Sequence, residues 1–527
     1  MTLAATSPAH SPTRARAHWW ALTGLLVLGG ALRLDAMRQD LFADELATYW
    51  IVSTRTASDV VSTVASTAEI TPPLSFLLSW LTTRPGLSPE LVRLPALLAG
   101  IASIPLVYAV GVRTVGSRAA LLAATLTALS PFMIYYSAEA RGYGVLMALL
   151  LLSTLALLLA LEHDRLRWWA LFALCTCLAA YTHYTAVFVL AGQVVWAAWV
   201  HRRARRSLLM AVGAAVVLYL PWLPSLKGDL DSPTTAILDF LSPLTAASAR
   251  STLGEWTVGF PVTLDEARLP FVLSVSSSRE LPPTAGWLLL AASLAVGTYG
   301  LWSMRSRLRS WFAEHGGHLG LVVLLAVVTP LGALLQSALG DNVFRARSLA
   351  ASWPYLALTI AALVTVGRPV VRAVAAGAAV AAFALSAIAL LGDDFTRPGY
   401  EQVAVIVGDH PGAVVVDGAV LSPGPLTNLE LEDEIEGTTI LRLNVPDRRD
   451  RPFGLLDPRP DPAEVASHAV AEADGGPIVV VAFDPVTSIV DDFLEELPDD
   501  YALAGTEVVP GLVDLQAFVF ERPDVET

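Results

Sequence analysis

The stretch that decides the fold is Gly142–Leu161, GYGVLMALLLLSTLALLLAL, which contains no charged residue. Its length matches the run of about 20 apolar residues that a helix needs to cross a bilayer. The whole chain of 527 residues is 54% hydrophobic and only 16% charged. Soluble domains carry about 25% charged residues, so this composition excludes an ordinary soluble protein and predicts an integral membrane protein.

Comparable apolar runs lie on both sides of this stretch, throughout the first 392 residues. We predict about eleven membrane-spanning helices from them. Their expected ranges are 18–35, 92–112, 118–137, 142–161, 168–184, 186–200, 207–225, 284–304, 318–338, 348–366 and 373–392.

Short arginine-rich connections predict the orientation, because such loops are retained on the cytoplasmic side. They occur at Arg14/Arg16, Arg113/Arg118, Arg165/Arg167, Arg202–Arg206, Arg305–Arg309 and Arg368/Arg372. This pattern predicts a cytoplasmic tail over 1–17, a transmembrane domain over 18–392 and a large first outer loop over 36–91. The apolar piece Pro72–Leu81 is too short to cross and would put the next arginines on the wrong side. We expect it to lie at the outer interface as an amphipathic or re-entrant segment.

The remaining residues, 393–527, form an acidic region with 29 Asp and Glu against 7 Arg, whereas the rest of the chain has a net charge of +8. Within it, Ala413–Asp417 and Ile478–Ala482 read as buried strands, Val490–Leu497 as a helix and Leu512–Glu521 as a late strand. We therefore predict a small soluble α/β domain outside the plasma membrane, serving as a substrate-guiding or structural cap. The net charge of −14 excludes a nucleic-acid partner.

Two carboxylate motifs fall on the predicted outer face. Leu41-Phe42-Ala43-Asp44-Glu45 follows the first span, and Glu139 lies in a very short connection just before Gly142. Ionisable groups beside membrane helices are costly and tend to be functional. The alternative for each motif is an interfacial acid solvated at the headgroups. We select Asp44, Glu45 and Glu139 as candidate catalytic residues.

Basic residues on the same face oppose the positive-inside trend. Arg93, Arg141, Arg345 and Arg347 lie close to span ends there. Arginine binds phosphate with bidentate geometry, so we select these four as candidate phosphate ligands. Aromatic residues in or near the motifs are candidate pocket residues: Tyr49, Tyr143 and His183.

Carboxylates and arginines gathered on one membrane face suit group transfer from a phosphate-bearing lipid. Outside the cytoplasm there are no nucleotide sugars, so a transferase there needs a lipid-linked donor. Such a donor requires a carboxylate that takes the proton of the acceptor hydroxyl and cations that stabilise the departing phosphate.

At this point the sequence resembles the GT-C superfamily of polytopic glycosyltransferases, in its protein-mannosyltransferase and aminoarabinose-transferase branch. The matching pieces occur in the expected order over about the first 360 residues. They are FADELATYW at 42–50, TPPLSFLL at 71–78, LVRLPALLAGI at 91–101, LSPFMIYYSAEARGYG at 129–144, AAYTHYTAVF at 179–188, LPWLP at 220–224 and RARSLAASWPYLAL at 345–358.

The resemblance implies an inverting hexosyl- or pentosyltransferase that uses a polyprenyl-phosphate sugar and a glycan, lipid or protein acceptor. It implies Asp44 as the base, Glu45 as its support and Glu139 as an orienting acid. A divalent metal ion, if one is used, would be held by Asp44 and Glu139. Two positions depart from the family pattern: Thr71 stands where a His or Lys is frequent, and Ala47 where some relatives have a basic residue.

Three other readings stay open at this point. A diphosphate-linked donor would make the protein a glycan polymerase or ligase. A transporter or flippase would show internal repeats or polar residues in the middle of its spans, and neither is found in the sequence. A non-catalytic sensor or scaffold would tolerate neutralisation of Asp44 and Glu139 together.

Overall fold

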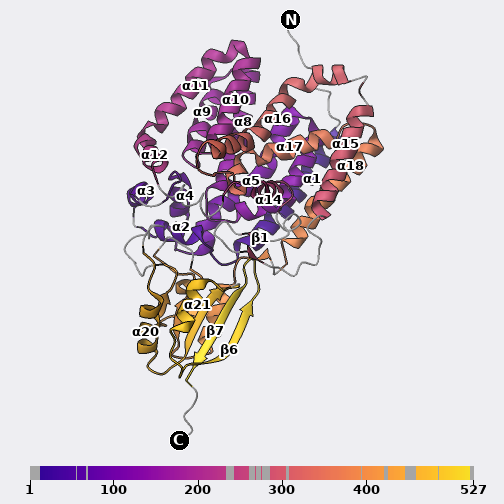
Figure 1. Ribbon diagram of the computed structural model, residues 1–527. Helices are drawn as coiled ribbons and strands as arrows, with labels where there is room; N and C mark the ends of the chain where they lie inside the picture. The colour runs from indigo at the N-terminus through magenta and orange to yellow at the C-terminus, as the bar shows by residue number, and fades with distance from the viewer. Residues whose placement is uncertain are drawn as a thin grey trace.

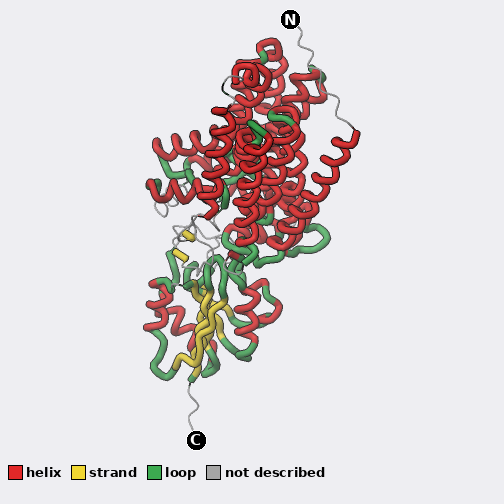
Figure 2. The backbone as a smooth tube through the Cα atoms, turned by 90° about the vertical axis from the view of Figure 1, so that its right-hand side faces the viewer, coloured by secondary structure: helices red, strands yellow, loops and turns green. Residues whose placement is uncertain are grey.

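A computed structural model describes residues 12–54, 56–66, 69–232, 243–259, 267–268, 274–275, 285–303, 305, 308–392, 395–420, 425–445, 458–484 and 486–522. These residues form a bundle of helices with a smaller region of strands and helices at one end (Figures 1 and 2). Residues 1–11 of the predicted tail, and parts of the connection between the predicted spans 207–225 and 284–304, lie outside the described residues.

The bundle has the helices of a multi-pass membrane protein. Among the described residues, seven helices are long and apolar enough to cross a bilayer, or eight if one bent pair is a single span. Three shorter apolar helices accompany them, and each of the eleven predicted segments coincides with one of these helices. The helices are α1 (Pro12–Met37), α5 (Pro89–Thr114), α6 (Ser117–Leu129) with α7 (Pro131–Ser137), α8 (Tyr143–His163), α9 (Leu166–Ala180), α10 (Ala186–Val200), α11 (Arg205–Tyr219) with α12 (Leu223–Leu230), α15 (Ala285–Ser303), α16 (Leu308–Leu339), η4 (Ala346–Ser352) with α17 (Trp353–Val364), and α18 (Pro369–Ala389).

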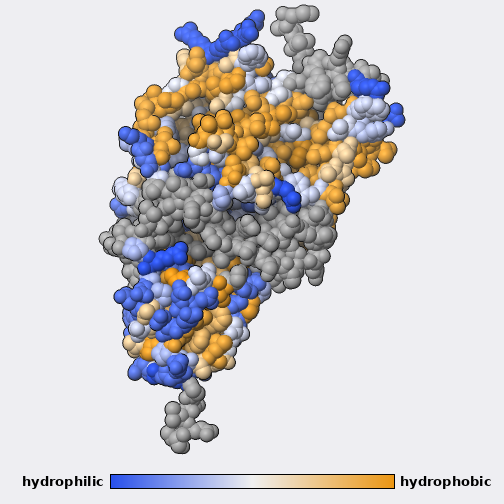
Figure 3. All heavy atoms as spheres, viewed as in Figure 1, coloured by the Kyte–Doolittle hydropathy of each residue, from blue (hydrophilic) through white to orange (hydrophobic). Residues whose placement is uncertain are grey.

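The surface of the bundle agrees with this reading. Large apolar side chains are exposed along its outer helices, among them Leu209, Val217, Leu331 and Leu335. In Figure 3 hydrophobic residues cover most of the visible face of the bundle, whereas hydrophilic residues are frequent over the strand-containing end. Extensive exposed apolar surface marks an interaction face of a protein. Together with the helices that are long and apolar enough to cross a bilayer, it confirms the predicted fold class.

The bent pair has a local cause. Pro131 cannot continue α6, and the side chain of Ser130 accepts a hydrogen bond from the backbone N–H of Met133, which caps a new helix. The axis turns by 59° at this point. The buried guanidinium of Arg33 donates to the carbonyls of Thr127 and Ala128, which α6 leaves unpaired at its end.

Short helices fill the predicted first outer loop: α2 (Asp44–Val52), α3 (Ala57–Ser66) and α4 (Leu74–Thr82). They pack on one another at the end of the bundle that carries the strand-containing region (Figure 1). Helix α4 covers most of the apolar piece predicted not to cross, and it is not among the candidate spans. A further helix, α14 (Ala246–Thr257), and the two-residue strands β1 (Ala267–Arg268) and β2 (Ser274–Val275) follow α12 in the chain.

The C-terminal unit is built on a five-stranded sheet with the order β4-β3-β5-β7-β6. The first three strands in this order are parallel and the rest antiparallel. Helix α19 packs on one face of the sheet, and helices α20 and α21 pack on the other. The bounds are β3 (Val414–Asp417), β4 (Ile440–Arg442), β5 (Ile478–Phe483), β6 (Ala502–Val509), β7 (Leu515–Glu521), α19 (Tyr400–Gly408), α20 (Pro462–Ala473) and α21 (Ser488–Glu495), with short turns η6 (Leu429–Leu431) and η7 (Asp433–Ile435).

The C-terminal unit and the bundle share one apolar core. Buried residues of the bundle, such as Phe42 and Ile134, belong to the same cluster as Phe395, Tyr400 and Val403. The contact lies at the Met37 end of α1. Because a helix rises 1.5 Å per residue, the 26 residues of α1 place Pro12 at the opposite end of the bundle.

Candidate active site

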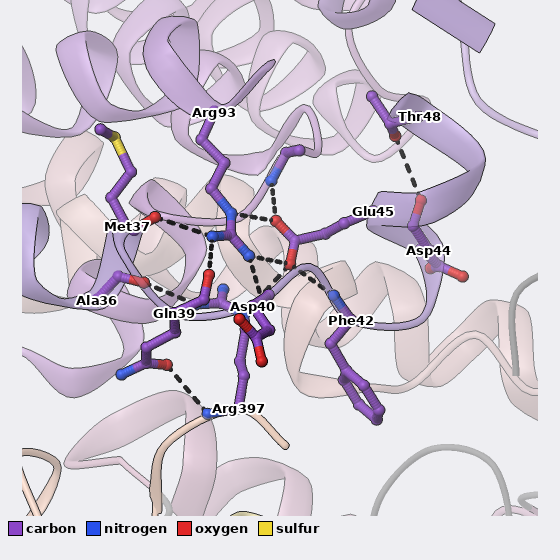
Figure 4. Close-up of polar contacts among 11 residues, drawn as sticks. Ala36, Met37, Gln39, Asp40, Phe42, Asp44, Glu45, Thr48, Arg93 and Arg397 are labelled. Carbon is purple, nitrogen blue, oxygen red and sulfur yellow. Dashed lines mark hydrogen bonds and ion pairs between the residues drawn. The ribbon is translucent and has the colours of Figure 1, made fainter. Parts of the chain in front are cut away.

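Two adjacent carboxylates begin helix α2. Ala43 has a positive φ of 47°, which turns the chain so that Asp44 and Glu45 form the first helical turn. Acidic residues are favourable there because the helix dipole is positive at its N-terminus. Successive helical residues point about 100° apart. Figure 4 shows the two carboxylates accordingly directed to different sides of the helix.

Glu45 is enclosed by cations and N–H groups. Arg93 donates to both of its oxygens at 2.7 Å, and the backbone N–H groups of Ala140 and Phe42 donate at 2.7 and 3.2 Å. Arg397 adds an ion pair at 3.3 Å. Burial raises the pKa of Glu45, but the charges of Arg93 and Arg397 outweigh it, and the net pKa is lowered. With 1% of its side chain exposed, Glu45 is an ionised internal anchor.

Arg93 holds the chain between α1 and α2. Besides its two bonds to Glu45, it donates to the carbonyls of Met37 at 2.8 Å, Asp40 at 2.7 Å and Gln39 (Figure 4). These contacts use all five N–H donors of a guanidinium, and the side chain is fully buried. The prediction that Arg93 contacts phosphate does not fit this geometry, because no donor remains and no surface is exposed.

Asp44 has a more open environment. One carboxylate oxygen accepts a hydrogen bond from Arg347 at 2.9 Å, and 22% of the side chain is exposed. Burial raises the pKa of Asp44, but the charges of Arg141, Arg347 and Arg345 outweigh it and lower the pKa overall. Three of the four predicted arginines therefore act on Asp44, although Arg347 follows it by 303 residues.

Arg141 is already paired with an acid that the sequence analysis did not select. Its two terminal nitrogens donate to Glu69 at 2.8 and 2.9 Å, and Thr71 also donates to Glu69 at 2.6 Å. The guanidinium stacks over the ring of Phe76 at 5.5 Å. Glu69 lies two residues before the motif TPPLSFLL at 71–78 but outside it, so the motif did not lead to its selection.

Glu139 lies in the turn between α7 and α8 beside the other acids. One of its oxygens, Oε2, is buried and has no hydrogen-bond partner. Burial and the charge of Glu45 raise its pKa to about 7, even though Arg397 and Arg141 act in the opposite direction. Asp44 and Glu139 thus interact electrostatically while their pKa values are shifted in opposite directions. Neighbouring carboxyl groups whose pKa values are shifted apart are typical of acid–base sites.

Aromatic residues line another side of the cluster. Tyr143 packs edge-on against Tyr136, with 5.1 Å between ring centroids, and against His183 at 5.4 Å. The hydroxyl of Tyr136 donates to Glu255 of α14 at 3.1 Å. Burial raises the pKa of Glu255 to about 7, although Arg347 lowers it in part. Glu255 is a second acid that the sequence analysis did not select.

His183 is held neutral. Its Nδ1 accepts a hydrogen bond from the backbone N–H of Thr185 at 3.2 Å. Burial and the nearby charges of Arg141 and Arg347 lower its pKa to about 3. His183 and Tyr143 therefore lie where the sequence analysis places them, beside the acids and arginines.

Tyr49 does not join this group in the described structure. It packs against an apolar cluster that includes Phe76 and Val92, and its acidic neighbour is Glu90. Its selection as a pocket residue gains no support from these contacts.

A metal site stays a prediction. In the part of the chain that the structure describes, no group of three or more His, Cys, Asp or Glu side chains is placed to hold a metal ion. The unpartnered oxygen of Glu139 and the exposed part of Asp44 would be the protein ligands of a divalent ion. Such an ion would supply a positive charge for the phosphate.

The chain is similar to several proteins of known structure. Two crystal structures of ArnT from Cupriavidus metallidurans, in the apo state and bound to undecaprenyl phosphate, are similar over 96% of this chain and 98% of theirs, with 15% and 14% identity and TM-scores of 0.44 and 0.43. The archaeal oligosaccharyltransferase AglB from Archaeoglobus fulgidus, in complex with an inhibitory peptide and a dolichol-phosphate, is similar over 89% of this chain and 70% of its own, with 12% identity and a TM-score of 0.48. No curated protein sequence matches.

A family model gives a direct sequence match. Residues 71–224 match the family described as dolichyl-phosphate-mannose-protein mannosyltransferase. The matched segment contains Glu139, Arg141, Tyr143 and His183, whereas Asp44 and Arg347 lie outside it. The resemblance predicted from the ordered motifs is therefore confirmed over residues 71–224.

Proposed function

We propose that the protein is a membrane glycosyltransferase that moves a sugar from a polyprenyl-phosphate donor to an acceptor hydroxyl, with inversion at the sugar carbon. One observation carries the proposal. Asp44 and Glu139 meet Arg141 and Arg347 in a single cluster, and two of these residues, Glu139 and Arg141, lie in the segment that matches the mannosyltransferase family. Proton acceptors and phosphate-binding cations are the two elements that such a transfer requires.

The cations would receive the departing phosphate. Arg347 reaches Asp44 through one terminal nitrogen at 2.9 Å, and 19% of its side chain is exposed. A donor phosphate is a competing anion for this guanidinium. Binding of the donor would draw Arg347 from Asp44, so the carboxylate loses its partner and becomes more basic when substrate is present.

In the reaction the acceptor oxygen forms a bond to C1 of the sugar while the bond from C1 to the phosphate oxygen breaks. The phosphate leaves with the electron pair, and the acceptor proton passes to Asp44. Asp44 is the better candidate for the base than Glu45, because Glu45 is buried and saturated with donors. Glu139, when ionised, would accept a hydrogen bond from substrate at its unpartnered oxygen.

We place the site on the outer face of the plasma membrane. Helix α5 has Arg93 in its first turns, next to the site, and Arg113 in its last turn, before a basic connection. Helix α8 begins at Tyr143 beside the site and ends before a connection that contains Arg165. The arginine-rich loops thus lie at the helix ends remote from the site, and such loops are retained in the cytoplasm. The C-terminal unit lies at the site end, outside the membrane in this orientation.

The test is a transfer assay with protein reconstituted in lipid. A panel of labelled polyprenyl-phosphate sugars is offered together with glycan, lipid and protein acceptors, and the products are identified by mass. We expect release of polyprenyl phosphate and one new glycosidic bond in wild type, lost in Asp44→Asn but retained in Glu90→Gln, an exposed acid in the first turn of α5.

Two outcomes would contradict the proposal. Turnover with diphosphate-linked donors alone would make the protein a polymerase or ligase. Movement of labelled lipid across the bilayer without a new glycosidic bond would make it a transporter.

A further inference from the structure

Arg397 belongs to the C-terminal unit but makes most of its contacts in the helical bundle. It lies between the end of α18 and the start of α19, and 3% of its surface is exposed. We infer that Arg397 is a positioning residue, through which the C-terminal unit fixes the turn that carries Asp44 and Glu45. This inference rests on the proposed transferase function.

The contacts of Arg397 converge on the end of α1 and the start of α2. Its guanidinium donates to the carbonyl of Ala36 at 3.0 Å and pairs with Glu45 at 3.3 Å, while its backbone N–H donates to the side chain of Gln39 at 3.0 Å (Figure 4). The same guanidinium stacks over the ring of Tyr135 at 4.6 Å. These contacts join α1, α2 and α7 at one side chain.

A neighbouring contact strengthens the link. The backbone N–H of Glu401, in the first turn of α19, donates to the carboxylate of Asp40 at 3.0 Å. Residues 36–40, which Arg93 holds from the bundle side, are therefore also held from the C-terminal side. The turn that places Asp44 is fixed from two directions, and one of them depends on the C-terminal unit.

This arrangement assigns the C-terminal unit a role beyond that of a cap. A positioning residue that shifts the reacting groups by about 1 Å can change turnover by roughly 10²-fold. We therefore expect Arg397→Met to lower kcat by about this factor with little change in the KM for donor.

The experiment compares Arg397→Lys, Arg397→Gln and Arg397→Met with Arg522→Met. Arg522 is in the same unit, pairs with Asp500 at 3.0 Å and is partly exposed, so its loss controls for damage to the unit alone. We measure kcat, the KM for donor and the unfolding temperature. Lys keeps the positive charge that pairs with Glu45 and should restore part of kcat, whereas Gln and Met should show the full loss of kcat with little change in the KM for donor.

The remaining outcomes of this experiment also support or contradict the role of Arg397. If Arg397→Met does not fold, the comparison of Lys with Gln replaces it. If no Arg397 variant folds, or if the folded variants keep wild-type kcat, the inference is wrong. If wild type transfers no sugar, the proposed transferase function fails; an unfolding temperature that falls in Arg397→Met but not in Arg522→Met would then still support the link between Arg397 and the turn.

Discussion

Asp44 and Glu45 are neighbours in the chain and yet occupy opposite kinds of site. Glu45 is 1% exposed, with two arginines and two backbone N–H groups around it. Asp44 is 22% exposed, and in the described structure its carboxylate accepts a hydrogen bond from Arg347. A buried, fully paired charge stabilises a fold, whereas an exposed and singly paired charge can exchange its partner for substrate. The number of hydrogen-bond donors around each carboxylate therefore distinguishes the two roles better than its charge or its position in the sequence.

The largest effect should come from neutralising the open acid. Asp44→Asn removes the proton acceptor and should lower turnover by about 10²–10⁴-fold, with the unfolding temperature close to that of wild type. The assay is single-turnover transfer, with Glu90→Gln as the control. Wild-type turnover in Asp44→Asn would remove Asp44 from the chemistry and erase the contrast with Glu45.

The second variant tests the closed acid. Glu45→Gln leaves Arg93 and Arg397 buried with an uncompensated charge, and breaking a buried pair costs about 3–5 kcal/mol. We expect a large fall in the unfolding temperature in detergent, with most of the activity lost through unfolding. Glu401→Gln, an exposed acid nearby, is the control. A stable Glu45→Gln protein with no turnover would place Glu45 in the chemistry instead.

Arg141 tests whether the arginines on the open side bind the donor. Because Arg141→Ala alone would leave Glu69 buried without its partner, we compare it with the double variant Glu69→Gln/Arg141→Ala. Loss of a charged hydrogen bond costs about 1.5–3 kcal/mol, so the KM for donor should rise by roughly 10- to 100-fold in both variants. An equal rise in the KM for acceptor would contradict donor binding by Arg141.

The smallest effect is a dependence of stability on pH. The pKa of Glu139 is raised from 4.5 to about 7 by burial and by Glu45, so the folded state binds this proton more tightly than the unfolded state. Stability should then fall as the pH rises from about 4.5 to 7 and level off above. Glu139→Gln should flatten this slope, and Glu255→Gln should remove a further part, since its pKa is also about 7. An unchanged slope in both variants would show that neither acid is buried as described.

The helices of the bundle could be predicted from the sequence because each must supply an uninterrupted apolar run. The buried strands β3 and β5 were predicted for the same reason. Strand β6 was not, because nearly all of it is exposed at the sheet edge and it shows no apolar alternation. Strand β4 and helices α19 and α20 were also not predicted, because their apolar patterns are short.

For the site, motifs indicated Asp44, Glu139 and Arg141, but not which partner each would have. Asp44 pairs with Arg347, and Glu45 pairs with Arg397 in addition to Arg93. Arg347 and Arg397 are more than 300 residues away in the chain, so the local sequence does not predict these contacts. Glu69 and Glu255 are single acids outside the motifs and become visible only when the fold brings them to Arg141 and Tyr136.

The apolar core shared by the bundle and the C-terminal unit limits which fragments of the protein can be produced separately. A fragment beginning near Phe395 would expose the faces of Tyr400 and Val403 that now pack beside Phe42, and should aggregate when produced alone. A chimera that exchanges this unit between related enzymes would need to exchange the end of α1 and the start of α2 with it. We therefore expect the C-terminal unit and the segment from the end of α1 to the start of α2 to be inherited together.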